Sequence, residues 1–161
     1  MNRYKPHVFI LPEDDRDRQL ADGFVLHDQV KSPRVQVLPP AGGWAEVLKT
    51  FKTEYISSLT RYPLGFLIML IDFDGAYNTR RPNLEAEIPE ALKERVFVVG
   101  VKETPEELRQ RFGKSYEQIG LDLADECYRG LETFWSDDHL RHNNPDLRRL
   151  DMAVKLLMFN N

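Results

Sequence analysis

The sequence predicts a single α/β domain with three layers: a mainly parallel four-stranded sheet, helices on both of its faces, and a helical C-terminal tail. Three observations support this fold. The chain has 161 residues, a length that suits one domain. Four short apolar runs alternate with segments of helical periodicity, an order typical of a parallel sheet with right-handed crossovers. Only helical signals follow residue 101, so we expect a core over about 7–101 and an extension over 102–161.

The four expected strands are apolar along most of their length, as parallel strands covered on both faces usually are. They span residues 8–11, 34–38, 65–71 and 96–101. The third run is the most apolar stretch of the chain and is therefore expected to be a central strand.

Helices are expected between the strands and throughout the C-terminal part. Apolar residues at three- and four-residue spacings predict a strong amphipathic helix over residues 44–56, with a less regular one over 16–29 and another over 84–94. The last three helices are expected to begin near Thr104, Ser115 and Asn144, where capping residues or proline mark helix starts.

The composition limits the location and the partners of the protein. The formal net charge is -4, which argues against a stand-alone nucleic-acid binder, since such proteins carry a basic excess. The single cysteine, Cys127, cannot form an internal disulfide and favours a reducing compartment. No secretory signal is visible and no apolar run reaches the roughly 18 residues of a membrane span, so we expect a cytoplasmic protein without membrane contact.

Acidic residues follow two of the expected strands. Glu13 and Asp17 come after the first strand, and Asp72 and Asp74 end the third. Ligands of open α/β sheets bind outside the carboxyl ends of the strands, so these carboxylates converge if the two strands are neighbours. Several carboxylates in one crevice repel each other unless protons or a cation intervene, and oxygen ligands favour Mg²⁺, Mn²⁺ or Ca²⁺. On a regular strand Asp72 and Asp74 would face the same side.

A purely structural role for single members of this group has to be weighed as well. Asp14 or Asp15 could cap the following helix, and Asp74-Gly75 is an ordinary turn signal. For each acid alone the structural interpretation is favoured; for the constellation as a whole the functional one is favoured.

At these residues the chain resembles the TOPRIM family, which includes topoisomerases, bacterial primases and the overcoming-lysogenization-defect nucleases. The matching positions are Glu13 with Asp17, Gly42-Gly43 after the second strand, and Asp72-Phe73-Asp74. The resemblance covers about residues 7–101. The chain departs from the family pattern at Asp14, where many members have glycine, and at Ala76, where a third aspartate would stand.

The resemblance implies a divalent-metal-dependent phosphodiester hydrolase that uses Mg²⁺ or Mn²⁺: a nuclease or a nuclease subunit. Glu13, Asp72 and Asp74 would then be catalytic. The expected metal ligands are Glu13, Asp17, Asp72, Asp74 and Glu103. Glu103 could equally be a first-turn helix acid, and that role is favoured for Glu106. Candidate cations that stabilise developing negative charge are Lys102, Arg80 and Arg81.

The resemblance also suggests partners. DNA or RNA is the expected substrate, bound weakly by an acidic chain without help. A separately encoded ATPase or a second copy of the chain is the expected partner, and a role in phage defence is a resemblance-level expectation. Two other classes stay open, namely a non-catalytic interaction module of a larger complex and a small-molecule phosphohydrolase.

Other constellations are weaker. Asp72-Phe73-Asp74-Gly75 is similar to the motif of phosphatases that form an aspartyl-phosphate, but it follows the third strand and no Ser or Thr comes next. No P-loop motif is present. His139 and His142 have a spacing that could bind Zn²⁺, although a helix end with a polar loop before Pro145 is favoured. Arg141 and His142 could instead contact a phosphate. Cys127 is expected to be a buried small residue rather than a nucleophile.

Overall fold

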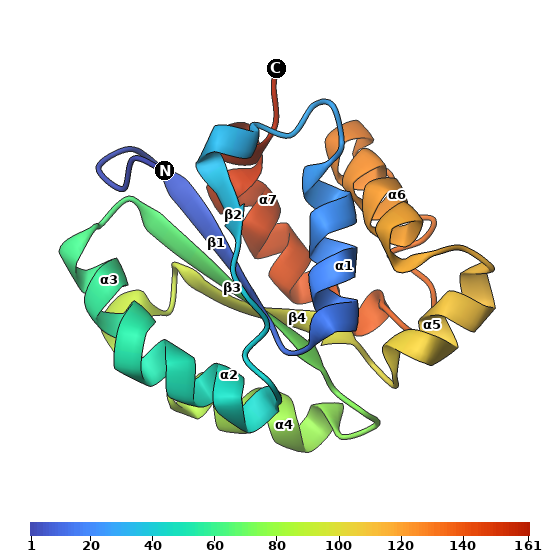
Figure 1. Cartoon of the computed structure of the whole chain (residues 1–161), viewed down its shortest axis with the longest axis horizontal. Coiled ribbons are helices and arrows are strands. Elements are labelled where there is room, and N and C mark those ends of the chain that lie inside the picture. Colours follow the sequence, from blue (N-terminus) through green and yellow to red (C-terminus); the bar gives the residue numbers. More distant parts are fainter.

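The computed structural model describes all 161 residues and contains one sheet of four parallel strands. In chain order these are β1 (His7–Pro12), β2 (Val35–Val37), β3 (Gly65–Asp72) and β4 (Val96–Val101). The order across the sheet is β2-β1-β3-β4, so β1 and β3 are central neighbours while β2 and β4 form the edges (Figure 1). The predicted four-stranded parallel sheet and the central place of the third strand are confirmed.

Seven α-helices surround the sheet. They are α1 (Asp15–Val25), α2 (Trp44–Thr50), α3 (Ile56–Arg61), α4 (Tyr77–Ala86), α5 (Pro105–Phe112), α6 (Tyr116–Arg129) and α7 (Asn144–Met158). A π-helical turn joins α2 to α3, and there are three short 3₁₀ turns. These connecting turns are Phe51–Tyr55, Ser32–Arg34, Glu90–Leu92 and Arg141–Asn143.

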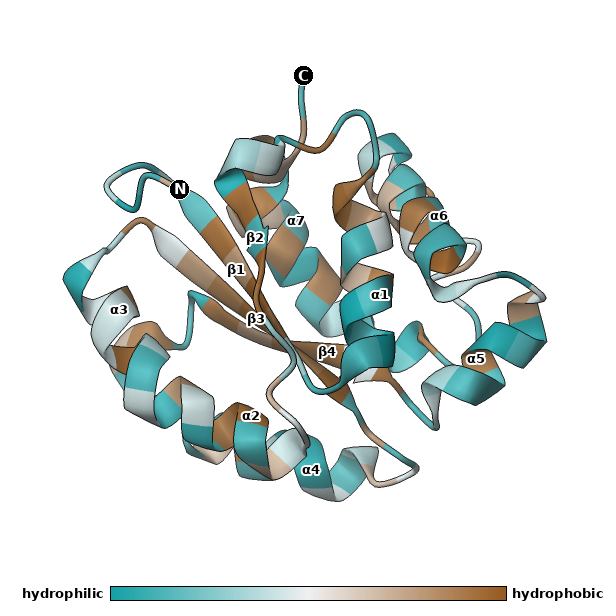
Figure 2. Ribbon diagram, viewed as in Figure 1, coloured by the Kyte–Doolittle hydropathy of each residue, from teal (hydrophilic) through white to brown (hydrophobic).

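The helices form a layer on each face of the sheet. Helices α2, α3 and α4 cover one face, where Phe9 and Leu11 of β1 belong to the larger core cluster. Helices α1 and α7 cover the other face, where Val8 and Ile10 are buried, and α6 packs against α1. Figure 2 shows the strands largely brown and the outward faces of the helices largely teal. Because both sheet faces are buried, the strands read as continuous apolar runs, which is why their positions could be predicted.

The helical C-terminal part was also predicted, and its start signals act as expected. The side chains of Thr104 and Ser115 accept backbone N–H groups at the starts of α5 and α6, and Gly130 ends α6 with a left-handed backbone. Rather than a separate tail, α7 contributes Val154 and Met158 to the core on its face of the sheet. Residues after 101 therefore complete the fold.

The prediction of a helix over residues 84–94 is wrong. The structure has α4 at Tyr77–Ala86, across the segment with Pro82, and then only a 3₁₀ turn at Glu90–Leu92. Proline inside a helix lacks one N–H donor, which made this segment look irregular. Helix α4 ends shortly before Pro89, because proline disfavours helical backbone at the residue that precedes it. The first helix is also shorter than expected and ends at Val25.

The outer edge of β4 is capped by a side chain. Gly100 donates its backbone N–H to Oδ1 of Asn143 (3.1 Å), and its carbonyl oxygen accepts from Nδ2 of the same side chain (2.9 Å). Nε2 of His142 also lies 2.7 Å from that carbonyl oxygen. The segment before α7 is thereby fixed to the edge of the sheet.

None of the helices is both long enough and apolar enough to cross a membrane.

Candidate functional site at the carboxyl ends of the central strands

The expected proximity of Glu13 and Asp72 is confirmed. Glu13 directly follows β1 and donates its backbone N–H to the carbonyl oxygen of Leu70 in β3 (2.9 Å). The backbone N–H of Asp72 in turn donates to Oε2 of Glu13 (2.5 Å). Both carboxylates are nearly inaccessible, at 8% and 7% exposure. Two acids from neighbouring strands therefore meet at the crevice where α/β proteins bind ligands.

The Gly42-Gly43 turn after β2 lies against the same strand end. The backbone N–H groups of Gly42 and Gly43 both donate to the carbonyl oxygen of Glu13, at 2.9 and 3.2 Å. Both glycines have positive φ angles, 101° and 141°, which residues with a side chain rarely adopt. The turn thus fixes the backbone from which the Glu13 side chain projects.

Helix α1 brings a second group of charges to the site. Asp14 is its N-cap and accepts the backbone N–H groups of Arg16 (3.0 Å) and Asp17 (3.1 Å), so the capping interpretation is correct for Asp14. The guanidinium of Arg16 donates to Oδ2 of Asp14 (2.5 Å), lies 3.8 Å from Oδ2 of Asp72 and pairs with Glu106 of α5. Sequence reasoning missed Arg16, because nothing distinguishes it from the other charged residues of this segment.

Asp17 is the most unusual member of the cluster. Its side chain is completely buried, and neither carboxylate oxygen has a hydrogen-bond partner. Oδ1 of Asp72 is likewise buried and unpartnered. Buried polar atoms without partners are rare in proteins, and an ion or a ligand is one common reason for them. These oxygens are free to accept a cation or a proton.

Burial and mutual repulsion shift the acids toward their neutral forms. Burial raises the pKa of Glu13 to about 7, and the charges of Asp72 and Asp14 act in the same direction. Burial, with the charge of Asp14, raises the pKa of Asp72 to about 6, against the opposing effect of Arg16. Burial also raises the pKa of Asp17 well above its ordinary value, helped by Asp14. Near neutral pH, Glu13 is therefore only partly ionised, and the ionised forms of Asp17 and Asp72 are less favourable than that of a solvent-exposed aspartate.

Asp74 and Glu103 lie at an adjoining turn. The regular strand ends at Asp72, and Asp74 is exposed, with a left-handed backbone (φ 49°). The backbone N–H of Asp74 donates to the carbonyl oxygen of Glu103 (2.8 Å), and a Cβ atom on Gly75 would lie 3.0 Å from Oε2 of Glu103. The strand geometry that was expected to point Asp72 and Asp74 to one side therefore does not extend to Asp74.

The candidate cations separate into two groups. Arg80 of α4 donates to the backbone oxygen of Asp72 (2.7 Å), and its guanidinium lies 5.4 Å from the ring centroid of Trp44. Arg81 is bound to Asp146 (2.7 Å) and Glu85 (3.0 Å), away from the acids. Lys102 is exposed. Arg80 is the candidate that the structure brings next to Asp72.

His142 is held as a neutral structural group. Burial lowers its pKa to about 4, so the ring is neutral near pH 7. The Nε2–H of this neutral ring donates to the carbonyl oxygen of Gly100. Its ring packs edge-on against Phe73 and Tyr77. These contacts support the structural interpretation of this histidine over the zinc one.

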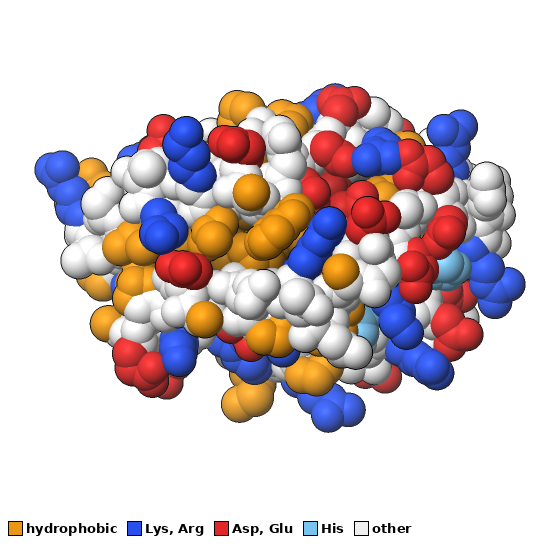
Figure 3. All heavy atoms as spheres, turned by 90° about the horizontal axis from the view of Figure 1, so that it is seen from below, with side chains coloured by type: hydrophobic (Ala, Val, Ile, Leu, Met, Phe, Trp, Pro, Cys, Tyr) orange, Lys and Arg blue, Asp and Glu red, His pale blue; other side chains and the backbone are white.

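Charged side chains gather on one part of the surface. In Figure 3, Asp and Glu side chains gather on the right half of the face that is seen from below, with several Lys and Arg side chains beside them. No three His, Cys, Asp or Glu side chains are spaced as the protein ligands of one ion. Mg²⁺ commonly uses only one or two carboxylates together with waters and phosphate oxygens. The orphaned oxygens of Asp17 and Asp72 fit that mode of binding.

Comparisons with protein-family models, with curated proteins and with solved structures found no match to this chain.

The raised pKa of Glu13 predicts a pH-dependent effect of Glu13→Gln. The folded-state value of about 7 exceeds the unfolded value of 4.5, so the folded protein binds more protons between these values and loses stability as the pH rises through them. Glutamine removes this penalty and can still accept the Asp72 N–H. In urea unfolding without metal ions, we expect the variant to be more stable than the wild type by about 1–3 kcal/mol at pH 8 and equally stable near pH 4.5.

Two comparisons make this measurement specific. His142 has the opposite dependence, because its lowered pKa makes folding less favourable as the pH falls from 6.5 toward 4, but this contribution is the same in both proteins. The exposed Glu46→Gln serves as the matched control and should show no such change. A Glu13→Gln difference that does not grow between pH 5 and pH 8 contradicts the prediction.

Proposed function

We propose that this protein is a divalent-metal-dependent phosphodiesterase that acts on nucleic acid. The observation that carries the proposal is the buried, unpartnered carboxylate of Asp17. It lies close enough to Glu13 and Asp72, where two neighbouring strands end, for their charges to raise its pKa. A bound cation would relieve the mutual repulsion of these acids, and the exposed Asp74 and the half-buried Glu103 add negative potential at the mouth of the site.

The residues of the site have the properties that this chemistry requires. One or two of the carboxylates of Glu13, Asp17 and Asp72 would hold Mg²⁺ or Mn²⁺ together with water, and the bound ion would activate water and neutralise charge on a phosphodiester. A carboxyl with a pKa of about 7 is partly deprotonated at neutral pH and can accept a proton from water. Arg80, next to Asp72, offers remaining guanidinium donors to a phosphate oxygen.

The net charge of -4 bears on how a nucleic acid could bind. An acidic chain gains little from counterion release at the phosphate backbone, so unaided binding is expected to be weak. A partner, such as a separate ATPase subunit, or a second copy of the chain would supply the missing contacts. This part of the proposal also implies a cytoplasmic location, where nucleic acid is accessible.

One observation favours a second candidate, a non-catalytic interaction module. The guanidinium of Arg16 already supplies a positive charge to Asp14, Asp72 and Glu106. In this case the acids and Arg16 form a self-contained charged cluster that holds α1 and α5 on the sheet.

The deciding experiment measures Mn²⁺ binding and metal-dependent cleavage by the purified chain. Substrates are single- and double-stranded DNA and RNA, and the proteins are the wild type, Glu13→Gln, Asp17→Asn and Asp72→Asn, with Glu46→Gln as the control. We expect each site variant to weaken Mn²⁺ binding by about 10- to 100-fold and to reduce cleavage by at least about 100-fold, while Glu46→Gln changes neither.

The outcomes distinguish the candidates. Mn²⁺ binding that the variants lose, without cleavage of any nucleic acid, contradicts the nuclease and leaves a small-molecule phosphohydrolase or a metal-binding module. No Mn²⁺ binding by the wild type, together with more stable variants, contradicts the metal site and favours the interaction module.

A further inference from the structure

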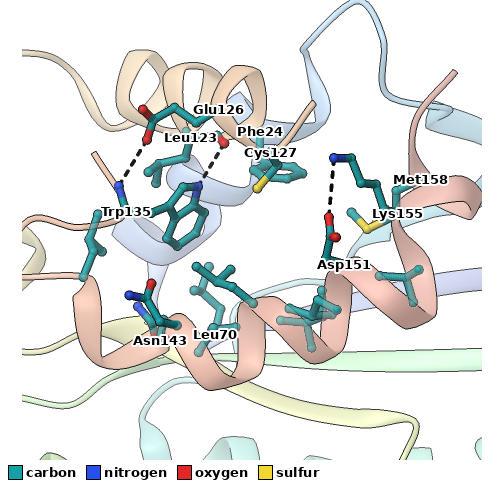
Figure 4. Close-up of a pocket in the computed structure, with 18 of the residues that line it drawn as sticks. Phe24, Leu70, Leu123, Glu126, Cys127, Trp135, Asn143, Asp151, Lys155 and Met158 are labelled. Atoms are coloured by element: carbon teal, nitrogen blue, oxygen red, sulfur yellow. Dashed lines mark hydrogen bonds and ion pairs between the residues drawn. The ribbon is translucent and has the colours of Figure 1, made fainter. Parts of the chain in front are cut away.

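A cavity of about 550 Å³ lies between the sheet and helices α1, α6 and α7 (Figure 4). Its walls come from α1, from strands β1, β3 and β4, from α6 and α7, and from residues 130–135. Figure 4 shows the sulfur of Cys127 and the indole of Trp135 turned into this space. Protein interiors rarely contain voids larger than a water molecule, so a space of this size is unusual for a packed core.

The cavity is apolar. Hydrophobic residues make up 20 of its 30 lining residues. Its innermost polar groups are already satisfied: the amide of Asn143 is bound to Gly100, and Oε1 of Glu126 accepts the backbone N–H groups of Phe134 (2.7 Å) and Trp135 (3.1 Å). Water needs two to four polar partners to be held in such a place, so an apolar occupant is favoured over water.

Apart from Glu126, whose Oε1 accepts two backbone N–H groups, the charged residues of the lining lie at the side and the rim of the cavity. Lys155 pairs with Asp151 (3.4 Å) on α7 at one side of the cavity. Glu132 and Arg148 are exposed and belong to the rim. Two apolar residues of the lining, Met152 and Leu131, are also strongly exposed, at 89% and 52%, and mark the opening to solvent.

The chemistry of Cys127 excludes covalent capture as the purpose of the cavity. Burial raises the pKa of its thiol to about 12, so it is not a nucleophile near neutral pH. Its sulfur acts as part of the apolar wall. The indole N–H of Trp135 is used as well, since it donates to the carbonyl oxygen of Leu123 (3.2 Å).

We propose that this cavity binds one small, uncharged, hydrophobic molecule per chain. Its volume lies within the range of about 300–1,000 Å³ that is usual for ligand sites, and is well above the roughly 150 Å³ that suffices for benzene. The cavity is a pocket that is partly open to solvent, with three helices and the sheet as its walls, and its volume matches a small molecule. The proposal does not depend on the metal site.

The test uses the neutral fluorescent probe N-phenyl-1-naphthylamine with the full chain. Trp135 lines the cavity, and Trp44→Phe leaves it as the only tryptophan. We expect saturable probe fluorescence at one molecule per chain, with a parallel decrease of Trp135 emission by energy transfer. Cys127→Phe, which places a ring in the cavity, is expected to weaken binding at least tenfold without lowering the midpoint of thermal unfolding.

Two further variants keep the result clear. Leu147→Phe fills the cavity from α7 and should also weaken binding in case Cys127→Phe does not fold. Leu26→Phe adds the same ring at an exposed apolar position outside the cavity and should leave binding unchanged. Absence of probe binding overturns the proposal, as does binding that survives both filling variants. A dimer in sedimentation that both filling variants dissociate overturns it too, since the occupant would then be a second copy of the chain.

Discussion

Replacing Gly120 with alanine is expected to lower the free energy of unfolding by about 3 kcal/mol, because it forces two closely packed helices apart. A Cβ atom at Gly120 of α6 would fall on the carbonyl oxygen of Leu20 and lie 2.8 Å from the backbone nitrogen of Phe24, both in α1. Backbone atoms cannot move aside as a flexible side chain can. The better helix propensity of alanine, about 1 kcal/mol, offsets only part of this cost.

Urea unfolding measures the effect, and Gln118→Ala in the same helix is the control, with an expected change within about 0.5 kcal/mol. Gly23 of α1 makes the reciprocal contact, since its Cβ would meet the backbone of Glu117. Once one substitution has separated the helices, the second should cost less, so the double variant should be less destabilised than the sum of the two. Gly120→Ala with wild-type stability contradicts the close packing of α1 on α6.

The same contact matters for the candidate site. Helix α1 has Asp14 as its N-cap and carries Arg16 and Asp17 in its first turn, and α6 holds α1 in place. A displaced α1 would move the buried Asp17 carboxylate relative to Asp72. Gly120→Ala is therefore expected to weaken Mn²⁺ binding although it lies far from the acids in the sequence.

The second large effect is expected for Asn143→Leu, which should lower the free energy of unfolding by about 2–4 kcal/mol. Asn143 is 1% exposed, and its amide satisfies both the N–H and the carbonyl oxygen of Gly100. Leucine satisfies neither, so a buried N–H group remains without a partner. Asn160→Leu, at an exposed position, should have little effect.

The variant Asn143→Asp tests whether stability is lost because the hydrogen bonds to Gly100 are missing or because the side chain has a different shape. A protonated aspartic acid can both donate to and accept from Gly100, whereas the carboxylate cannot donate and is buried. Its folded-state pKa should therefore lie above the unfolded value of about 3.9. Stability should approach that of the wild type at low pH and be lost as the pH rises through the folded-state value. If Asn143→Asp is equally destabilised at pH 4 and pH 8, hydrogen bonding to Gly100 is not the cause.

The fold could be predicted from the sequence because burial on both faces leaves a plain signal. The run over Gly65–Asp72 is apolar, and the structure places it in the centre of the sheet. The start of the helix that contains Pro82 was missed because proline is uncommon inside helices and is usually a sign of a loop. Helix starts such as that at Thr104 could be predicted because a single capping residue in the sequence marks them.

The candidate site could be predicted only in part. The meeting of Glu13 and Asp72 depends on β1 and β3 being neighbours, and the alternation of strands and helices left that strand order open. The burial of Asp17 and the contact of Arg16 with Asp72 both depend on how α1 is placed against the sheet. The cavity between α1, α6 and α7 depends on the distances between helices, about which residue patterns say nothing.

The amide of Asn143 also limits how this protein can assemble. Proteins often associate by adding a strand of one chain to the open side of a sheet in another. On the β4 side, an incoming strand would have to displace Asn143 from Gly100. On the other side, β2 offers only three residues, Val35–Val37, and such short strands are poor templates for pairing. Any larger complex of this protein is therefore expected to be built through its helices rather than by a continuous sheet.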